Sequence, residues 1–141
     1  LRQRVQLAEA KGQRFALLFI DADNFKAAND NHGHAAGDAV LVALSERIKD
    51  TLRKGDFAAR IGGDEFIVII DPLDETVRPE GLAERLRASA SRPIALPGGE
   101  QYRLGLSVGA AVYPDDGADA RALLTAADAA MYADKLTNRS K

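Results

Sequence analysis

The chain has 141 residues, of which 46% are hydrophobic and 28% charged, as is typical of one compact domain with its own core. Its formal net charge of −2, from 19 basic and 21 acidic residues spread along the chain, excludes the basic surface of a nucleic-acid-binding domain. No apolar run is long enough for a membrane helix, and the absence of cysteine excludes disulfides and thiolate zinc sites.

Hydrophobic periodicity predicts the elements of the first half of the chain. Apolar residues at helical spacing predict a helix up to residue 11, capped by Gly12. The run RFALLFID (14–21) is typical of a strand that is buried on both faces. A polar segment punctuated by glycine follows, and apolar residues every three or four positions then predict an amphipathic helix over 38–53.

The second half of the chain predicts two strands joined by a tight hairpin at Gly62 and Gly63. The predicted elements are, in order, strands over 56–60 and 65–70, a helix ending near 91, a strand over 104–113 and a helix over about 120–136. The resulting order, α-β-α-β-β-α-β-α, predicts an α/β (α+β) fold. Its core is a ferredoxin-like split βαβ arrangement with a mixed central sheet and helices packed against it.

Acidic residues gather at two points of this predicted sheet. The segment DADNFKAANDNHGHAAGD (21–38) begins where a buried strand ends, and a second acidic pair stands at 64–65. Taken alone, Asp21 would be interpreted as an ordinary aspartate that ends a strand and caps the next turn. Carboxylates that converge from neighbouring strands, in a chain without cysteine, instead favour a hard cation with oxygen ligands, Mg²⁺ first. An ion-pair network remains the alternative, and its basic partners would be Lys26, Arg60 or Lys135.

Four segments together form a family signature. They are GGDEF (62–66), the pattern D-x-D-x-F-K-x-x-N-D-x-x-G-H-x-x-G-D (21–38), LSVGAAVYP (106–114) and AADAAMYADK (126–135). The chain resembles a GGDEF domain, the catalytic module of diguanylate cyclases, and the resemblance covers nearly the whole chain, with the four segments in the family's order. The resemblance implies one GGDEF domain over 1–141, with the palm-type nucleotidyl cyclase fold. Because the chain lacks a start methionine, we expect it to be part of a longer multidomain protein.

The resemblance also implies a reaction and its partners. Two GTP molecules would condense to cyclic di-GMP with release of two pyrophosphates, in an Mg²⁺- or Mn²⁺-dependent reaction of bacterial second-messenger signalling. The active form would be a homodimer of two facing GTP-loaded domains. We expect a cytoplasmic location, no nucleic acid partner, and no membrane contact through these residues, although the rest of a longer chain can carry an anchor. The alternatives are a catalytically silent GGDEF module that binds GTP or cyclic di-GMP and regulates an attached domain, and a cyclase that uses one nucleotide.

The family motifs assign roles to particular positions. Asp21, the backbone carbonyl of Ala22 and Asp64 would hold the metal, and Asp64 would also help to deprotonate the attacking hydroxyl. Glu65 and Lys26 are further candidates for a direct role in catalysis. The remaining substrate-binding candidates are Asn24, Phe25 and Lys26 at the β- and γ-phosphates, Gly62 and Gly63 beside the nucleotide, and Lys135 and Arg139 at the terminal phosphates. Taken singly, each lysine would be interpreted as a solvated surface residue.

Asn29 and Asp38 match the family's guanine-binding pair. Asp38 can accept hydrogen bonds from the base, and an adenine would leave both side chains unpaired. Without the resemblance, Asp38 is equally well explained as the N-cap of the following helix. We expect His34 to be a packed or loop-fixing residue, and Asp23 to orient the phosphate loop or to pair with a lysine.

A second site is implied by RKGD (53–56). Arg53 and Asp56 form an R-x-x-D pattern six residues before Gly62, and the family uses this pattern to bind cyclic di-GMP as an allosteric product inhibitor. Arg85 matches an additional arginine from a neighbouring helix. Without the resemblance, Arg53 and Asp56 would be a surface ion pair worth less than about 1 kcal/mol.

Overall fold

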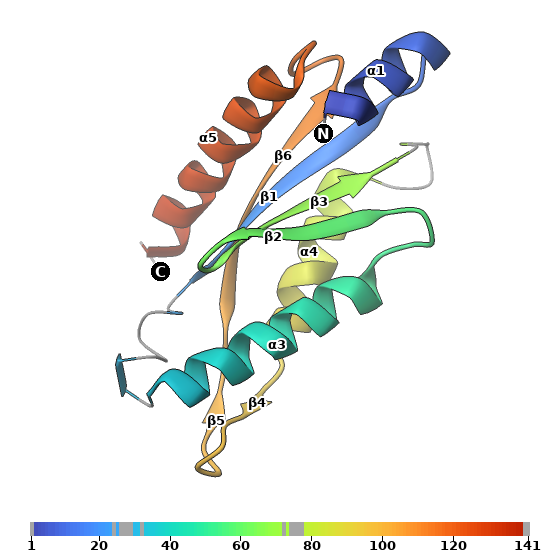
Figure 1. The fold of residues 1–141 in the computed structure, drawn as a ribbon. Coiled ribbons are helices and arrows are strands. Elements are labelled where there is room, and N and C mark those ends of the chain that lie inside the picture. Colours follow the sequence, from blue (N-terminus) through green and yellow to red (C-terminus); the bar gives the residue numbers. More distant parts are fainter. Residues whose placement is uncertain are drawn as a thin grey trace.

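The computed structural model describes residues 2–23, 25, 30–31, 33–71, 73 and 78–139. Figure 1 shows its helices and strands along the chain. They are, in order, α1 (Arg2–Lys11), β1 (Phe15–Asp23), α3 (His34–Thr51), β2 (Phe57–Gly62), β3 (Glu65–Ile70), α4 (Pro79–Ala90), β4 (Ile94–Ala95), β5 (Gln101–Tyr102), β6 (Gly105–Tyr113) and α5 (Ala120–Arg139). No helix in these ranges is both long and apolar enough to cross a membrane.

The main sheet has four strands in the order β2-β3-β1-β6. Every neighbouring pair is antiparallel. Since β2 and β1 are both antiparallel to β3, they run parallel to each other, with β3 inserted between them. This is the predicted split βαβ arrangement, and the fold class is confirmed. The sheet differs in one respect from the prediction: it is antiparallel and not mixed, because the insertion of β3 keeps the parallel strands from pairing.

Strand β1 is buried on both faces, and its alternation separates two layers of core. Leu18 and Ile20 face the layer that contains α3 and α4. Leu17 and Phe19 face the layer that contains α1 and α5. Asp21 continues the odd-numbered series, so its side chain points towards α5. The period of the strand therefore decides which helix meets the first acidic residue.

Helix α5 lies unusually close to β6 at Gly109. A Cβ atom added at this position would lie 2.1 Å from the backbone nitrogen of Met131 and 2.2 Å from the carbonyl oxygen of Ala127. No side chain fits between strand and helix at this point. Gly109 thus sets the height of α5 above the sheet.

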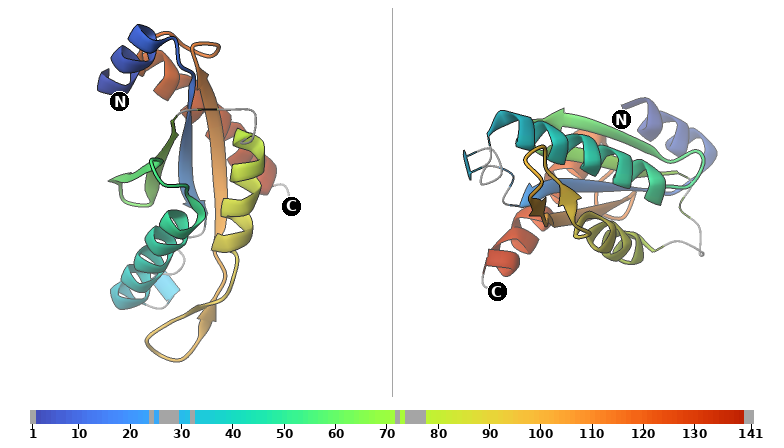
Figure 2. Two further views of the ribbon diagram at one scale, coloured as in Figure 1. Left: turned by 90° about the vertical axis from the view of Figure 1, so that its right-hand side faces the viewer. Right: turned by 90° about the horizontal axis from the view of Figure 1, so that it is seen from below.

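The start of α3 and the β4–β5 hairpin differ from the sequence-based prediction. Helix α3 begins at His34 and not at 38, and its N-cap is Gly33, with φ of 88° and no side-chain cap bond. The interpretation of Asp38 as an N-cap is therefore wrong, since Asp38 lies in the second turn and is exposed. His34 is exposed as well, so it is not a packed residue. The β4–β5 hairpin was not predicted, and it projects beyond the main sheet (Figure 2).

Candidate active site

The end of β1 meets the turn between β2 and β3. Asp21 is paired with Glu65 of β3 on one side and with Ser107 of β6 on the other. The backbone N–H of Ala22 donates to the carbonyl oxygen of Asp64 at 3.0 Å. The C-terminal end of α5 lies beside this point (Figure 1). Residues from both ends of the chain are thereby brought to one edge of the sheet.

The hairpin turn itself is shifted by one residue from the prediction. Gly62 still pairs with Glu65, so the two turn residues are Gly63 and Asp64. The strand register is irregular between Arg60 and Gly62. Arg60 Nε donates to the carbonyl oxygen of Gly63 at 2.9 Å. This shift places the Asp64 side chain in the turn, at the tip of the hairpin.

Neither the backbone conformation nor the packing of the described residues requires glycine at positions 62 and 63. Neither has a φ in the left-handed region, and an added Cβ at either position would meet no described atom within 4 Å. Folding alone therefore does not explain two successive glycines at this hairpin. Open space above the turn is what a ligand outside the chain would need.

Asp21 is buried and only half satisfied. Its Oδ2 accepts a hydrogen bond from Lys135 Nζ at 2.5 Å, and the Asp21 side chain is 9% exposed. Its Oδ1 is buried and has no hydrogen-bond partner in the described part of the chain. An unpartnered buried carboxylate oxygen is costly, so this atom is available for a cation. The alternative ion-pair network is thus realised in part, through Lys135.

The pKa values of three side chains around Asp21 are shifted. Burial, followed by the neighbouring Asp21 carboxylate, raises the pKa of Asp64. Burial and the carboxylates of Asp21, Asp64 and Asp128 raise the pKa of Glu65. The hydrogen bond to Asp21 is the largest cause that raises the pKa of Lys135. The acids disfavour one another's ionisation, so the site has an excess of negative charge that a cation would relieve.

The predicted metal ligands fit a hard divalent cation. The residues with described positions contain no group of three or more His, Asp or Glu side chains arranged to hold a metal. The predicted set is smaller: two carboxylates and one backbone carbonyl, with the other ligands coming from substrate and solvent. The unpartnered Oδ1 of Asp21 and the nearby Asp64 carboxylate supply such oxygen donors.

The other predicted residues of the nucleotide site have varied positions. Asp38 lies exposed on α3, and Phe25 packs against the core layer of α3 and α4. The predictions for Asn24, Lys26 and Asn29, and for the Arg139 side chain, fall outside the described residues. Their roles remain predictions.

The R-x-x-D segment forms a compact local ion pair. Asp56 Oδ2 accepts from the backbone N–H of Arg53 at 2.9 Å and from Arg53 Nε at 3.2 Å. Asp56 Oδ1 accepts from Arg53 Nη2 at 3.1 Å. The Asp56 side chain is only 2% exposed, against 32% for Arg53. Arg85 is exposed on α4. Asp56 therefore orients Arg53, whose side chain is about a third exposed.

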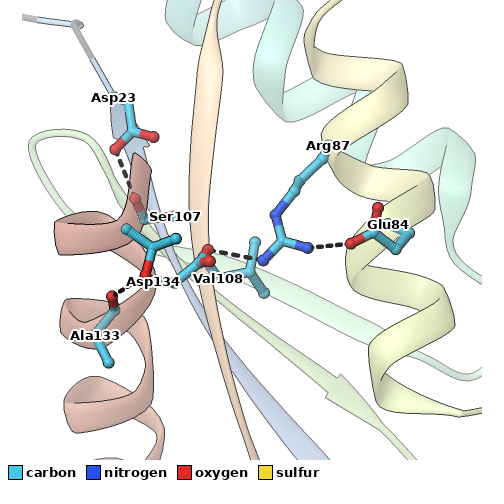
Figure 3. Close-up of polar contacts among 8 residues, drawn as sticks. Asp23, Glu84, Arg87, Ser107, Val108, Ala133 and Asp134 are labelled. Atoms are coloured by element: carbon cyan, nitrogen blue, oxygen red, sulfur yellow. Dashed lines mark hydrogen bonds and ion pairs between the residues drawn. The ribbon is translucent and has the colours of Figure 1, made fainter. Parts of the chain in front are cut away.

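Sequence reasoning missed three polar residues near the site. Ser107 Oγ donates to Asp23 Oδ1 at 2.7 Å, which gives Asp23 a partner other than the expected lysine or phosphate loop (Figure 3). Asp128 lies two helical turns before Lys135, on the same side of α5. Asp134 accepts from β6 and from α4. The helical spacing was a usable signal for Asp128, whereas Ser107 and Asp134 depend on contacts between distant segments.

Comparison with known proteins identifies the family to which the chain belongs. The family model described as "Diguanylate cyclase, GGDEF domain" matches residues 1–141, so the chain belongs to the GGDEF domain family. Diguanylate cyclase TpbB of Pseudomonas aeruginosa is 42% identical over 132 residues, which are 94% of this chain and 30% of TpbB. An uncharacterized signaling protein of Caulobacter vibrioides is 42% identical over 140 residues, 99% of this chain and 17% of that protein. The chain thus spans less than a third of the length of these two relatives.

Solved structures agree with this assignment. The GGDEF domain of TpbB from Pseudomonas aeruginosa superimposes with a TM-score of 0.92 at 42% identity, over 97% of this chain and 85% of that chain. The GGDEF domain of DgcB from Caulobacter crescentus, solved in complex with c-di-GMP, gives a TM-score of 0.87 at 30% identity, over 97% of this chain and 81% of that chain. Both the fold class and the resemblance to GGDEF domains are confirmed.

Proposed function

We propose that residues 1–141 form one diguanylate cyclase domain, which condenses two GTP molecules into cyclic di-GMP with release of two pyrophosphates. The observation that carries this proposal is the meeting of Asp21, Asp64 and Lys135 at the end of β1, where an unpartnered carboxylate oxygen lies beside a second acid and an ammonium group. Relatives named diguanylate cyclase support the proposed activity. GGDEF domains solved with c-di-GMP support the proposed product.

Asp21, the Ala22 carbonyl and Asp64 would hold a divalent cation, for which Mg²⁺ is the first candidate and Mn²⁺ the second. Such a cation supplies charge stabilisation at the phosphoryl oxygens and at the leaving pyrophosphate. Asp64 is the candidate to accept the proton of the attacking 3′-hydroxyl, since its carboxylate lies in the hairpin turn beside Asp21. Glu65, which lies opposite Asp21 on the same face of the sheet, is a further candidate for this proton transfer.

Lys135 reaches the site from α5. Its ammonium group neutralises Asp21 in the structure, and we propose that it contacts the terminal phosphates when nucleotide is bound. Lys26 and Arg139 would add positive charge, and Asn24 and Phe25 would contribute backbone N–H groups. The two hairpin glycines leave room for the nucleotide, and Asn29 with Asp38 would bind guanine.

The proposal also includes a homodimer and an inhibitory site for the product. Each 3′-hydroxyl attacks the α-phosphate of the other nucleotide, so two domains must face each other and the active form is a homodimer. Arg53, held by Asp56, and Arg85 would bind cyclic di-GMP at an inhibitory site through phosphate contacts and stacking on guanine.

The test is incubation of the protein with GTP and Mg²⁺, followed by chromatography of the products. Cyclic di-GMP and pyrophosphate should appear with wild type and be lost with Asp64→Ala. Glu9→Gln, which changes an exposed acid on α1, is the matched control and should leave product formation unchanged.

The alternative of a silent binding module gives a different result. In that case GTP would raise the melting temperature of the wild type, yet no cyclic di-GMP would form. That outcome, also obtained with a chain extended at its N-terminus, would overturn the proposed catalysis and support a regulatory module. Formation of a cyclic mononucleotide would instead indicate a cyclase that uses one nucleotide.

A further inference from the structure

Asp134 joins three elements at the open edge of the sheet. Strand β6 pairs with β1 on one side only in the described four-stranded sheet. On its other side, the Val108 backbone N–H donates to Asp134 Oδ2 at 2.8 Å. The same oxygen accepts from a terminal guanidinium nitrogen of Arg87 at 2.7 Å. Figure 3 shows Arg87 reaching from α4 past β6 to Asp134 on α5.

This contact connects helices that pack on opposite faces of the sheet. Helix α4 belongs to one core layer and α5 to the other. The side chains of Arg87 and Asp134 are 29% and 23% exposed, so the ion pair is partly shielded from solvent. Partial burial makes such a charge-assisted pair stronger than a fully exposed one.

Arg87 also binds a second acid, on its own helix. Its other terminal nitrogen lies 2.7 Å from Glu84 Oε1, and the Glu84 side chain is 75% exposed. The arginine is thus held between Glu84, three residues earlier, and Asp134, 47 residues later. Glu84 offers a matched control, because its loss removes one partner of Arg87 without touching α5.

The neighbour of Asp134 in sequence is the lysine of the candidate site. Consecutive helical residues point about 100° apart, so Asp134 can reach the edge of β6 while Lys135 reaches Asp21. A lysine ammonium lies roughly 8 Å from its helix axis, so a rotation of α5 by about 20° would displace it by about 3 Å. Such a displacement would break the contact between Lys135 and Asp21.

We propose that Arg87 and Asp134 are positioning residues for the nucleotide site: their ion pair around the edge of β6 sets the rotation of α5 and thereby holds the Lys135 ammonium group at Asp21. The inference rests on the proposed function for its effect on GTP. It assigns to Arg87 and Asp134 no contact with substrate.

The first test compares three single variants in steady-state kinetics. Asp134→Asn keeps an oxygen for the Val108 N–H but loses the ion pair, and Arg87→Gln loses the same ion pair from the other side. Each should raise KM for GTP about three- to tenfold, with kcat within about twofold, because nucleotide binding weakens while the reacting groups are intact. Glu84→Gln should leave both constants unchanged, and Arg87→Lys should recover part of the loss. Unchanged KM in Asp134→Asn and Arg87→Gln would overturn the proposal.

The second test asks whether Asp134 acts through Lys135. In a Lys135→Met background, Asp134→Asn should cause no further increase in KM, because the positioned group is already absent. A general loss of stability would instead multiply KM by the same factor in both backgrounds. That additive result would overturn the proposal in favour of a purely structural role.

The third test separates this proposal from the proposed function. If the wild type forms no cyclic di-GMP, calorimetry with Mg²⁺ and 3′-deoxy-GTP, which lacks the attacking hydroxyl, replaces KM by Kd with the same expected ratios. If the wild type binds no nucleotide, the proposed function fails, but amide hydrogen exchange still tests the pair. Exchange in the last two turns of α5 should be faster in Asp134→Asn and Arg87→Gln than in Glu84→Gln, and equal rates in all variants would overturn the proposal.

Discussion

Lys135 of α5 donates to Asp21 of β1 at 2.5 Å, although 114 residues separate them in sequence. The two side chains are 25% and 9% exposed. The ammonium group therefore neutralises a carboxylate that would otherwise be a buried, uncompensated charge. This ion pair holds α5 to the end of β1 at the candidate active site.

Removal of Lys135 should destabilise the metal-free domain. We expect Lys135→Met to lower the free energy of unfolding by about 1–3 kcal/mol, because Asp21 is left buried without a counter-charge. Adding Asp21→Asn should recover most of this loss, since the remaining amide is neutral. Urea unfolding of the two single variants and the double variant measures the effect. Equal losses that simply add in the double variant would contradict the stabilising role of the pair.

Asp64 should have the opposite effect on stability. Its pKa is raised in the folded domain, so folding disfavours its charged form, and stability increases as pH falls through that raised pKa. Asp64→Asn should therefore raise the melting temperature of the metal-free domain by a few degrees at pH 7 and hardly at all near pH 4. Thermal unfolding with a chelator at both pH values tests this.

Addition of Mg²⁺ provides the matched comparison for Asp64. Because the cation would relieve the repulsion between Asp21 and Asp64, it should stabilise the wild type more than Asp64→Asn. Equal stabilisation of both proteins by Mg²⁺ would contradict a metal role for Asp64.

Gly109 should tolerate no larger residue. Gly109→Ala would place a Cβ within 2.2 Å of the backbone of α5, so the helix must move away from β6. We expect a loss of more than about 3 kcal/mol in the free energy of unfolding, together with a loss of activity. Gly81→Ala is the control, because Gly81 is exposed in α4 and an added Cβ there meets no described atom within 4 Å. It should be neutral or slightly stabilising by circular dichroism melting.

Arg47 should stabilise the contact between α3 and α4. Its guanidinium donates to the carbonyl oxygens at the end of α4 and just beyond it, at 2.6–3.2 Å, namely those of Ser89, Ala90, Arg92 and Pro93. Arg47→Met should cost about 2–3 kcal/mol by urea unfolding, because these carbonyls lose a charged donor. Lys49→Met, an exposed change on the same helix, should cost less than about 0.5 kcal/mol. Similar costs for both would show that the four bonds do not contribute.

Arg53 should control inhibition by product. Arg53→Ala removes the guanidinium that Asp56 orients, so we expect half-inhibition to need at least about tenfold more cyclic di-GMP, with little change in activity without added product. Initial rates measured against added cyclic di-GMP provide the test. An unchanged inhibition curve would refute the proposed inhibitory site.

Local sequence patterns were sufficient for most of the elements. The apolar runs that became β1, β3 and β6 and the helical periods of α1 and α5 predicted structure correctly, because burial of one face or two is visible in the order of residues. The start of α3 was misplaced, since Asp38 is a favourable capping residue while the true N-cap, Gly33, makes no side-chain bond. Strands β4 and β5 have two residues each, too few to show a period.

By itself the sequence determined the family, through the motifs around Asp21 and at 62–66, and with the family the candidate site residues. Only the tertiary structure decided which of them meet. In the structure, Lys135 forms an ion pair with Asp21, and Arg87 forms one with Asp134. The hairpin turn consists of Gly63 and Asp64 and not of the predicted Gly62 and Gly63. Side-chain contacts across 47 or 114 residues depend on strand register and helix rotation, which packing of the whole domain sets and no local pattern encodes.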